Sequence, residues 1–232
     1  FHLNFLNYKK DQDDKLEIII LGDKSLLSNE IILKNISIKE KNNKFEVKNL
    51  SLSKEYKIRS ISKINLSYFD NDLLKNDLSI KKRDKNYSLE SKSFNATKII
   101  DDLLKDDKNS ENKKIFSKNF KLNIKIEEAF LDKDHPIEDL VGYLTFNNSE
   151  VIDANLAGDF PDNQRINLTI RSNSNEKITT LYSDLAKPFV NRHKFIKGFE
   201  DGNLDFYSIK QNNVSNSKLK IDNFKVQEVP AL

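Results

Sequence analysis

The chain has 232 residues, of which 39 Lys and Arg and 36 Asp and Glu leave a net charge of +3, and it contains no cysteine. This length holds one large or two small domains with a buried core, while the missing cysteines exclude disulfides, a thiol nucleophile and zinc sites built on Cys. The basic residues are scattered among acids, which is typical of a solvated face and does not favour a nucleic-acid partner.

The first half of the chain alternates apolar and polar residues, and this period of two predicts β-strands. FEV at Phe45 and ISKINLSYF around Ile64–Tyr68 show the alternation, with polar breaks such as EKNNK and KRDKN. The stretch SFNATKIIDDLLKD departs from it and predicts a short helix with Asn95 as its N-cap. The apolar residues at helical spacing there are Ile99, Ile100, Leu103 and Leu104.

A strongly polar run, KDDKNSENKK, follows this helix from Lys105 to Lys114. It predicts an exposed loop and a boundary between two halves of the chain. We therefore expect an N-terminal β meander over residues 1–106 that ends in a short helix, a polar loop over 107–115, and a second β segment over 116–232.

The second half returns to the period of two in FKLNIKI, INLTI, LDF and the closing stretch SKLKIDNFKVQEVPAL. Between them, TTLYSDLAKPFVNRHKF predicts a helix near 180–192. Its helix-like face consists of Leu181, Leu185, Phe189 and Val190. Pro188 either bends this helix or starts it.

Strands of about five residues at intervals of about ten to fifteen indicate antiparallel meanders and a mainly β fold. Each strand has one wet and one apolar face, so a sheet of this length must curl on itself, meet a second sheet or leave its apolar face as a groove. The pattern alone leaves these three alternatives open.

No apolar run approaches the roughly twenty residues that a membrane helix needs. The missing initial Met and the abrupt end at Leu232 suggest a segment of a longer protein.

No set of residues for catalysis or metal binding stands out. The three histidines, His2, His135 and His193, lie in unrelated contexts. His135 has acidic neighbours in LDKDHPIEDL but no ligand spacing, which favours a turn. The paired acids of DNDLL lack the glycine and the terminal glutamate of a calcium loop. With no glycine-rich phosphate loop and no G-x-S-x-G motif, we expect a protein that is not an enzyme and uses no cofactor.

The stretch TTLYSDLAKPFVNRHKFIKGFEDGNLDF, continued to KLKIDNFKVQEVPAL, resembles the AsmA-like family, in particular its YhdP-type members. In these proteins a serine and an aspartate open a short helix, and a glycine-containing loop and two strands follow. The upstream stretch NYSLESKSFNATKIIDDLL is similar to the family's strand-then-helix phrase. The family-motif residues in this chain are Ser183, Asp184, Ala186, Gly198, Gly202 and Pro230.

The resemblance implies a long, curved and twisted antiparallel sheet that forms an open half-pipe groove, with two short helices. It also implies a periplasmic segment of a protein anchored in the inner membrane of a Gram-negative bacterium by an N-terminal helix absent from this chain. The implied function is a passive apolar groove that conducts phospholipid between the inner and outer membranes. The implied partners are phospholipid acyl chains, the inner membrane, and the outer membrane or its assembly factors. The groove candidates are Phe120, Leu122, Ile124, Ile126, Ile166, Leu168, Ile170, Leu204, Phe206, Leu219 and Ile221.

A second hypothesis fits the same alternation of residues. The chain could be a structural or interaction β-module that supports outer-membrane assembly without binding lipid. Its apolar side chains would then pack against one another as an ordinary core. The two hypotheses differ in whether apolar side chains of the sheet stay accessible to a ligand.

Overall fold

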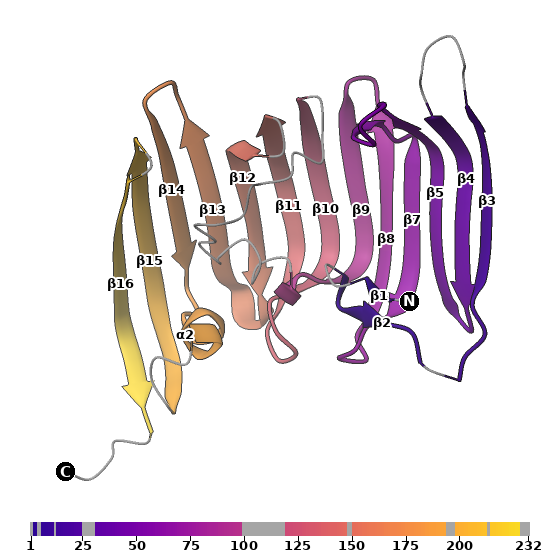
Figure 1. The fold of residues 1–232 in the computed structure, drawn as a ribbon. Coiled ribbons are helices and arrows are strands. Elements are labelled where there is room, and N and C mark those ends of the chain that lie inside the picture. The colour runs from indigo at the N-terminus through magenta and orange to yellow at the C-terminus, as the bar shows by residue number, and fades with distance from the viewer. Residues whose placement is uncertain are drawn as a thin grey trace.

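The computed structural model describes residues 2–3, 6–11, 13–24, 31–98, 119–147, 150–193, 198–212 and 214–227. Fourteen strands stand side by side in one large sheet, and two further strands pair in a hairpin of their own (Figure 1). The sheet is not closed into a barrel, and its two edges are β3 (Glu17–Lys24) and β16 (Val214–Val226). The prediction of a mainly β fold is confirmed.

The strands follow one another along the sheet in chain order, except that β6 pairs beside β5, off the main path. The remaining strands of the sheet are β4 (Ile31–Glu40), β5 (Asn43–Leu52), β6 (Ile58–Ser60), β7 (Lys63–Phe69), β8 (Lys75–Arg83), β9 (Asn86–Asn95), β10 (Phe120–Phe130), β11 (Pro136–Asn147), β12 (Glu150–Phe160), β13 (Gln164–Ser172), β14 (Glu176–Ser183) and β15 (Phe199–Gln211). The separate hairpin is β1 (His2–Leu3) and β2 (Tyr8–Lys9), and the 3-10 turn η2 (Pro161–Asn163) joins β12 to β13.

One strand pair differs from the predicted antiparallel pattern. β9 and β10 are parallel, with Ile124 beside Leu89, whereas every other pair is antiparallel. The sheet is therefore mixed. Parallel neighbours cannot be joined by a tight turn, so a long crossover connection links β9 to β10. The predicted polar loop over 107–115 belongs to that connection and lies outside the described residues. The sheet itself continues without a break from the first half of the chain to the second.

The helix predictions need one correction. The segment expected to be a helix near 180–192 is a strand up to Ser183, and the helix α2 covers Lys187–His193. Leu181 is not on a helix face, because it pairs in β14 between Leu168 and Phe206. Pro188 lies in the first turn of α2, where a missing N–H costs no helical hydrogen bond. The one α-helix that lies wholly within the described ranges is α2.

The other predicted helix lies almost wholly outside the described residues, including Ile99, Ile100, Leu103 and Leu104. Its expected N-cap is described, and the Asn95 side-chain oxygen accepts a hydrogen bond from the Thr97 backbone N–H at 3.1 Å. Thr97 and Lys98 have helical backbone. This is the contact by which an N-cap residue satisfies a free donor of the first turn.

Strand register brings most of the apolar side chains onto a single face of the sheet, which we call the apolar face. One line of directly opposed residues crosses all thirteen strands of the main path (the fourteen less β6). We call this line the middle rung. It consists of Ile20, Ile36, Val47, Ile64, Ile80, Leu89, Ile124, Gly142, Leu156, Leu168, Leu181, Phe206 and Leu219. With about 4.8 Å between strands, the rung spans roughly 58 Å.

A second line of mostly apolar residues lies two residues away on every strand and is buried over most of its length. We call it the covered rung. It consists of Ile18, Ile38, Phe45, Leu66, Leu78, Ser91, Ile126, Leu140, Gly158, Ile166, Ser183, Leu204 and Ile221, with a β-bulge between β11 and β12 at Leu140. The hairpin β1–β2 and α2 both lie against this face, at the same end of the sheet (Figure 1).

Candidate functional site

All eleven predicted groove residues lie on the apolar face. Ile124, Leu168, Phe206 and Leu219 belong to the middle rung, and Ile126, Ile166, Leu204 and Ile221 to the covered rung. Phe120, Leu122 and Ile170 lie on the far side of the middle rung, where Leu122 opposes Leu144 and Ile170 opposes Ala154. The polar residues between them point to the opposite face, as the period of two requires.

Burial separates the two rungs. In the covered rung Ile126, Ile166 and Leu204 are buried, so these three predicted groove residues pack against protein. In the middle rung only Leu89 is buried. The other non-glycine side chains are half-buried, and the ends are open, with Ile20 58% and Leu219 50% exposed. The accessible apolar surface therefore follows the middle rung.

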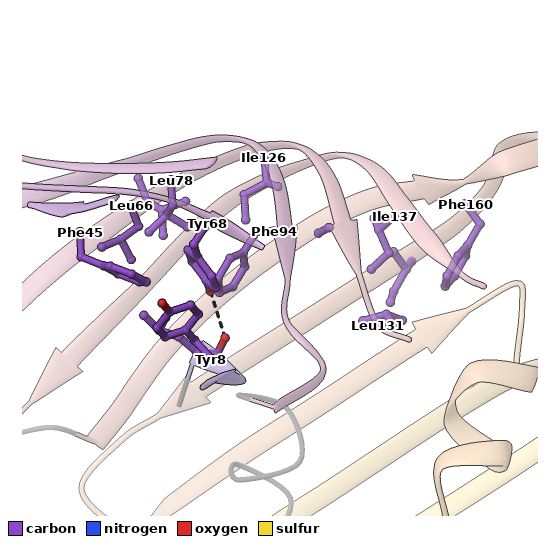
Figure 2. Close-up of a cluster of buried hydrophobic side chains, with 14 residues drawn as sticks. Tyr8, Phe45, Leu66, Tyr68, Leu78, Phe94, Ile126, Leu131, Ile137 and Phe160 are labelled. Carbon is purple, nitrogen blue, oxygen red and sulfur yellow. Dashed lines mark hydrogen bonds between the residues drawn. The ribbon is translucent and has the colours of Figure 1, made fainter. Parts of the chain in front are cut away.

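The hairpin β1–β2 packs over the covered rung in the N-terminal part of the sheet. Tyr8 is 2% exposed, and its ring centre lies 4.8 Å from that of Phe45 and 5.8 Å from that of Tyr68. Figure 2 shows Tyr8 facing these two rings from the side away from the sheet. The rings exclude water from Leu66 and Leu78 as well, and each side chain of this size gains about 1.5–3 kcal/mol when fully buried.

Two phenol groups anchor this hairpin. The Tyr8 hydroxyl donates to the buried Glu40 carboxylate, and the Tyr68 hydroxyl donates to the Leu6 backbone oxygen at 3.2 Å. Burial, together with the hydrogen bond to Glu40, raises the pKa of Tyr8 well above its usual range, and burial does the same to the pKa of Tyr68. Both phenols therefore stay protonated and keep donating at every physiological pH.

A buried polar network around Asp70 lies beside the hairpin. The Asp70 carboxylate accepts the amide groups of Asn95 at 2.7 Å and Asn76 at 3.2 Å, and the backbone N–H groups of Asp72 and Leu74 at 2.9 and 3.0 Å. Both oxygens of Asp70 are thus engaged in fixing a turn. No group of three side chains that could hold a metal ion occurs in the part of the chain that the structure describes.

His135 lies in a turn, as its sequence context predicts. The Asp132 side chain accepts the backbone N–H groups of Asp134 and His135, each at 2.9 Å, and lies 2.7 Å from the His135 ring nitrogen Nδ1. His2 lies in β1 and His193 ends α2, so the three histidines occupy separate elements.

Ser183, Asp184 and Ala186 lie in the turn that brings α2 over the apolar face. Ser183 is fully buried, and its hydroxyl donates to the Leu185 backbone oxygen at 2.7 Å. The Ala186 N–H donates to the Gly202 oxygen at 2.7 Å, and Ala186 packs with Val190, Phe199 and Leu204. These contacts cover the C-terminal end of the covered rung, at Leu204 and Ile221.

Two glycines of the motif have positive φ, +65° at Gly198 and +81° at Gly202, a conformation that side chains disfavour. A Cβ at Gly202 would also lie 3.0 Å from the Phe224 Cβ. Asp184 accepts the Arg165 N–H at 2.8 Å and the Tyr182 hydroxyl. The Tyr182 hydroxyl holds the pKa of the Asp184 carboxyl below its usual range, against the opposing effect of partial burial. Pro230 lies outside the described residues.

Sequence reasoning missed the covering elements. The strands β1 and β2 are two residues long, so they carry no periodic signal, and the bond between Tyr8 and Glu40 joins residues that are 32 positions apart. The only local sign is the alternation of Leu6 and Tyr8. The sequence could not predict the register of the middle rung either, because periodicity places a residue on one face of a strand but does not determine its cross-strand partner.

The comparisons with known proteins give no relative. No family model matches the chain, and no curated protein or solved structure matches it either. Among the described residues no helix is long and apolar enough to cross a membrane.

Proposed function

We propose that the apolar face carries lipid acyl chains, and that the chain is a periplasmic lipid-handling segment of an AsmA-like, YhdP-type protein. The observation that carries this proposal is the middle rung, a line of mostly half-buried apolar side chains that crosses the whole sheet in register, with Leu89 buried and Gly142 as its one gap. Packing in a closed protein core accounts for apolar residues that are buried, but not for those that stay accessible to solvent. Half-exposed apolar side chains in one continuous line fit a ligand with a long apolar surface.

The energetics suit a conduit. Covering each methylene is worth about 0.8 kcal/mol, so a sixteen-carbon chain gains roughly 13 kcal/mol from full cover. No charged residue interrupts the middle rung, and its one gap is Gly142. That glycine is required by the backbone, since a Cβ there would lie 1.9 Å from the Asn155 oxygen. A uniform apolar surface has no deep well to stop a sliding chain.

The setting of this function follows from the same proposal. The inner membrane, reached through an N-terminal helix, would supply the phospholipid, and the outer membrane or its assembly factors would receive it. The protein would act as a passive surface without enzymatic chemistry or a cofactor. These partners and this location depend on the family resemblance of residues 86–104, 179–206 and 218–232.

A direct test places a charge on the middle rung. The double variant Ile124→Asp and Leu168→Asp should lose most of its binding of a fluorescent phospholipid, because each carboxylate would have to be desolvated beneath an acyl chain. The matched control is Lys125→Asp with Thr169→Asp, at the neighbouring positions on the polar face.

Circular dichroism and thermal melting establish that both proteins fold. Ile124→Thr, which changes the side chain less, provides a milder variant and should weaken binding by a smaller factor. Equal lipid binding by the two double variants would refute the proposal and favour the structural module. The covered rung is the observation that supports that alternative, because there the apolar side chains already have protein partners.

A further inference from the structure

A cavity of about 540 Å³ lies on the apolar face near the end of the sheet opposite the hairpin β1–β2. Its apolar lining includes Ile64 and Ile80, which are neighbours in the middle rung, and Leu122. Three rings form an aromatic wall: the ring centre of Phe120 lies 5.3 Å from that of Tyr87 and 4.8 Å from that of Phe146. The cavity is thus continuous with the middle rung.

The aromatic wall is held in place by the backbone. The Tyr87 hydroxyl accepts a hydrogen bond from the Ile61 N–H at 3.2 Å, which ties β9 to the segment between β6 and β7. The stacked rings of Phe120 and Phe146 join β10 to β11. A wall of this kind offers apolar surface in a fixed position and loses little side-chain freedom when a ligand binds.

The charged residues that line the cavity are mostly basic. Its lining contains Arg59, Lys82 and Lys85 against the single carboxylate Asp84, a balance of three minus one, or +2. Lys82 is the informative member, because it follows Ile80 by two residues and opposes Tyr87, which places it on the apolar face. Lys82 therefore places a positive charge next to the middle rung, near the end of β8.

We propose that this cavity is a headgroup subsite for an anionic amphiphile. The carboxylate or phosphate of the ligand lies among Lys82, Lys85 and Arg59, and its acyl chain runs over Ile80 and Ile64 along the middle rung. Ammonium groups act as point charges for such anions, and a guanidinium adds paired N–H donors. This inference rests on the proposed function and adds to it a preference for negatively charged lipid.

The test compares two probes of equal chain length, oleate and oleyl alcohol. Wild-type protein should bind oleate more tightly than the alcohol, and added salt should reduce only the oleate affinity. The double variant Lys82→Gln and Lys85→Gln should bind oleate about fivefold more weakly, since two solvent-exposed charge contacts are lost. Its affinity for oleyl alcohol should stay unchanged, as should both affinities of the control Lys125→Gln, whose side chain is exposed on the polar face.

The outcomes separate this inference from the function on which it rests. Equal binding of both probes, unaffected by the Lys82 and Lys85 substitutions, would overturn the headgroup subsite and leave the acyl-chain proposal standing. Failure of wild-type protein to bind either probe would overturn both. Inorganic phosphate serves as a third arm. If it binds at this site as tightly as oleate does, the cavity is a plain anion site and the inference is wrong.

Discussion

The covered rung and the middle rung run side by side on one face of the sheet, two residues apart on every strand, and both consist mostly of isoleucine and leucine. Their surroundings differ. Tyr8 from the hairpin and Val190 from α2 pack over the covered rung, while the middle rung, apart from Leu89, is only partly buried. The same alternation in sequence thus yields an ordinary core in one line and accessible apolar surface in the next. What decides the outcome is the presence of a second layer.

The largest expected effect compares Phe45 of the covered rung with Val47 of the middle rung, both in β5. Phe45→Ala should cost about 3–5 kcal/mol of unfolding free energy, because the ring packs against Tyr8 and Tyr68 and leaves a cavity. Val47→Ala should cost only about 1 kcal/mol, because its side chain is already partly in water. Urea unfolding measures both. Equal costs would mean that the middle rung is as well packed as the covered one.

A smaller effect is expected from the turn that carries α2. The Asp184 carboxylate is stabilised by Tyr182 and by the Arg165 N–H, and its pKa in the folded protein is below the usual value. Its contribution is therefore present above the ordinary carboxyl pKa and is lost as the pH falls through the lower, folded value. Asp184→Asn should cost about 1 kcal/mol at neutral pH.

The cost of Asp184→Asn should shrink in acid, as the wild-type carboxylate takes up a proton. Thermal melting of both proteins between neutral and acidic pH measures this difference. A cost that is the same at all pH values would contradict the assigned role of the charge. Lipid binding at the middle rung should change little, which separates the covering of the sheet from the proposed function.

The period of two predicted the strands where it was strict. FKLNIKI is β10 and INLTI lies in β13, with their apolar residues on one face as expected. The helix prediction over Leu181 was wrong because TTLYS combines β-favouring residues with a spacing that also fits one helical turn. Strand pairing with β13 and β15 decides that case, and it depends on residues that are distant in sequence.

The features that distinguish the two rungs could not be read from the sequence. Burial by the hairpin depends on Tyr8 reaching Glu40 and on Tyr68 reaching Leu6, contacts across 32 and 62 residues. The parallel pairing of β9 with β10 also joins segments on either side of a long connection. Local patterns carry no information on such contacts, so the sequence indicates an apolar face without indicating which part of it is covered.

The most direct test of the lipid-binding proposal is site-specific photo-cross-linking to phospholipid. A photoreactive residue at Ile124 or Leu168, in the middle rung, should form lipid adducts. The same residue at Lys125 or Thr169, on the polar face, should form few or none. Equal labelling of the two faces, or no labelling at either, would contradict the proposal that the middle rung contacts hydrocarbon chains.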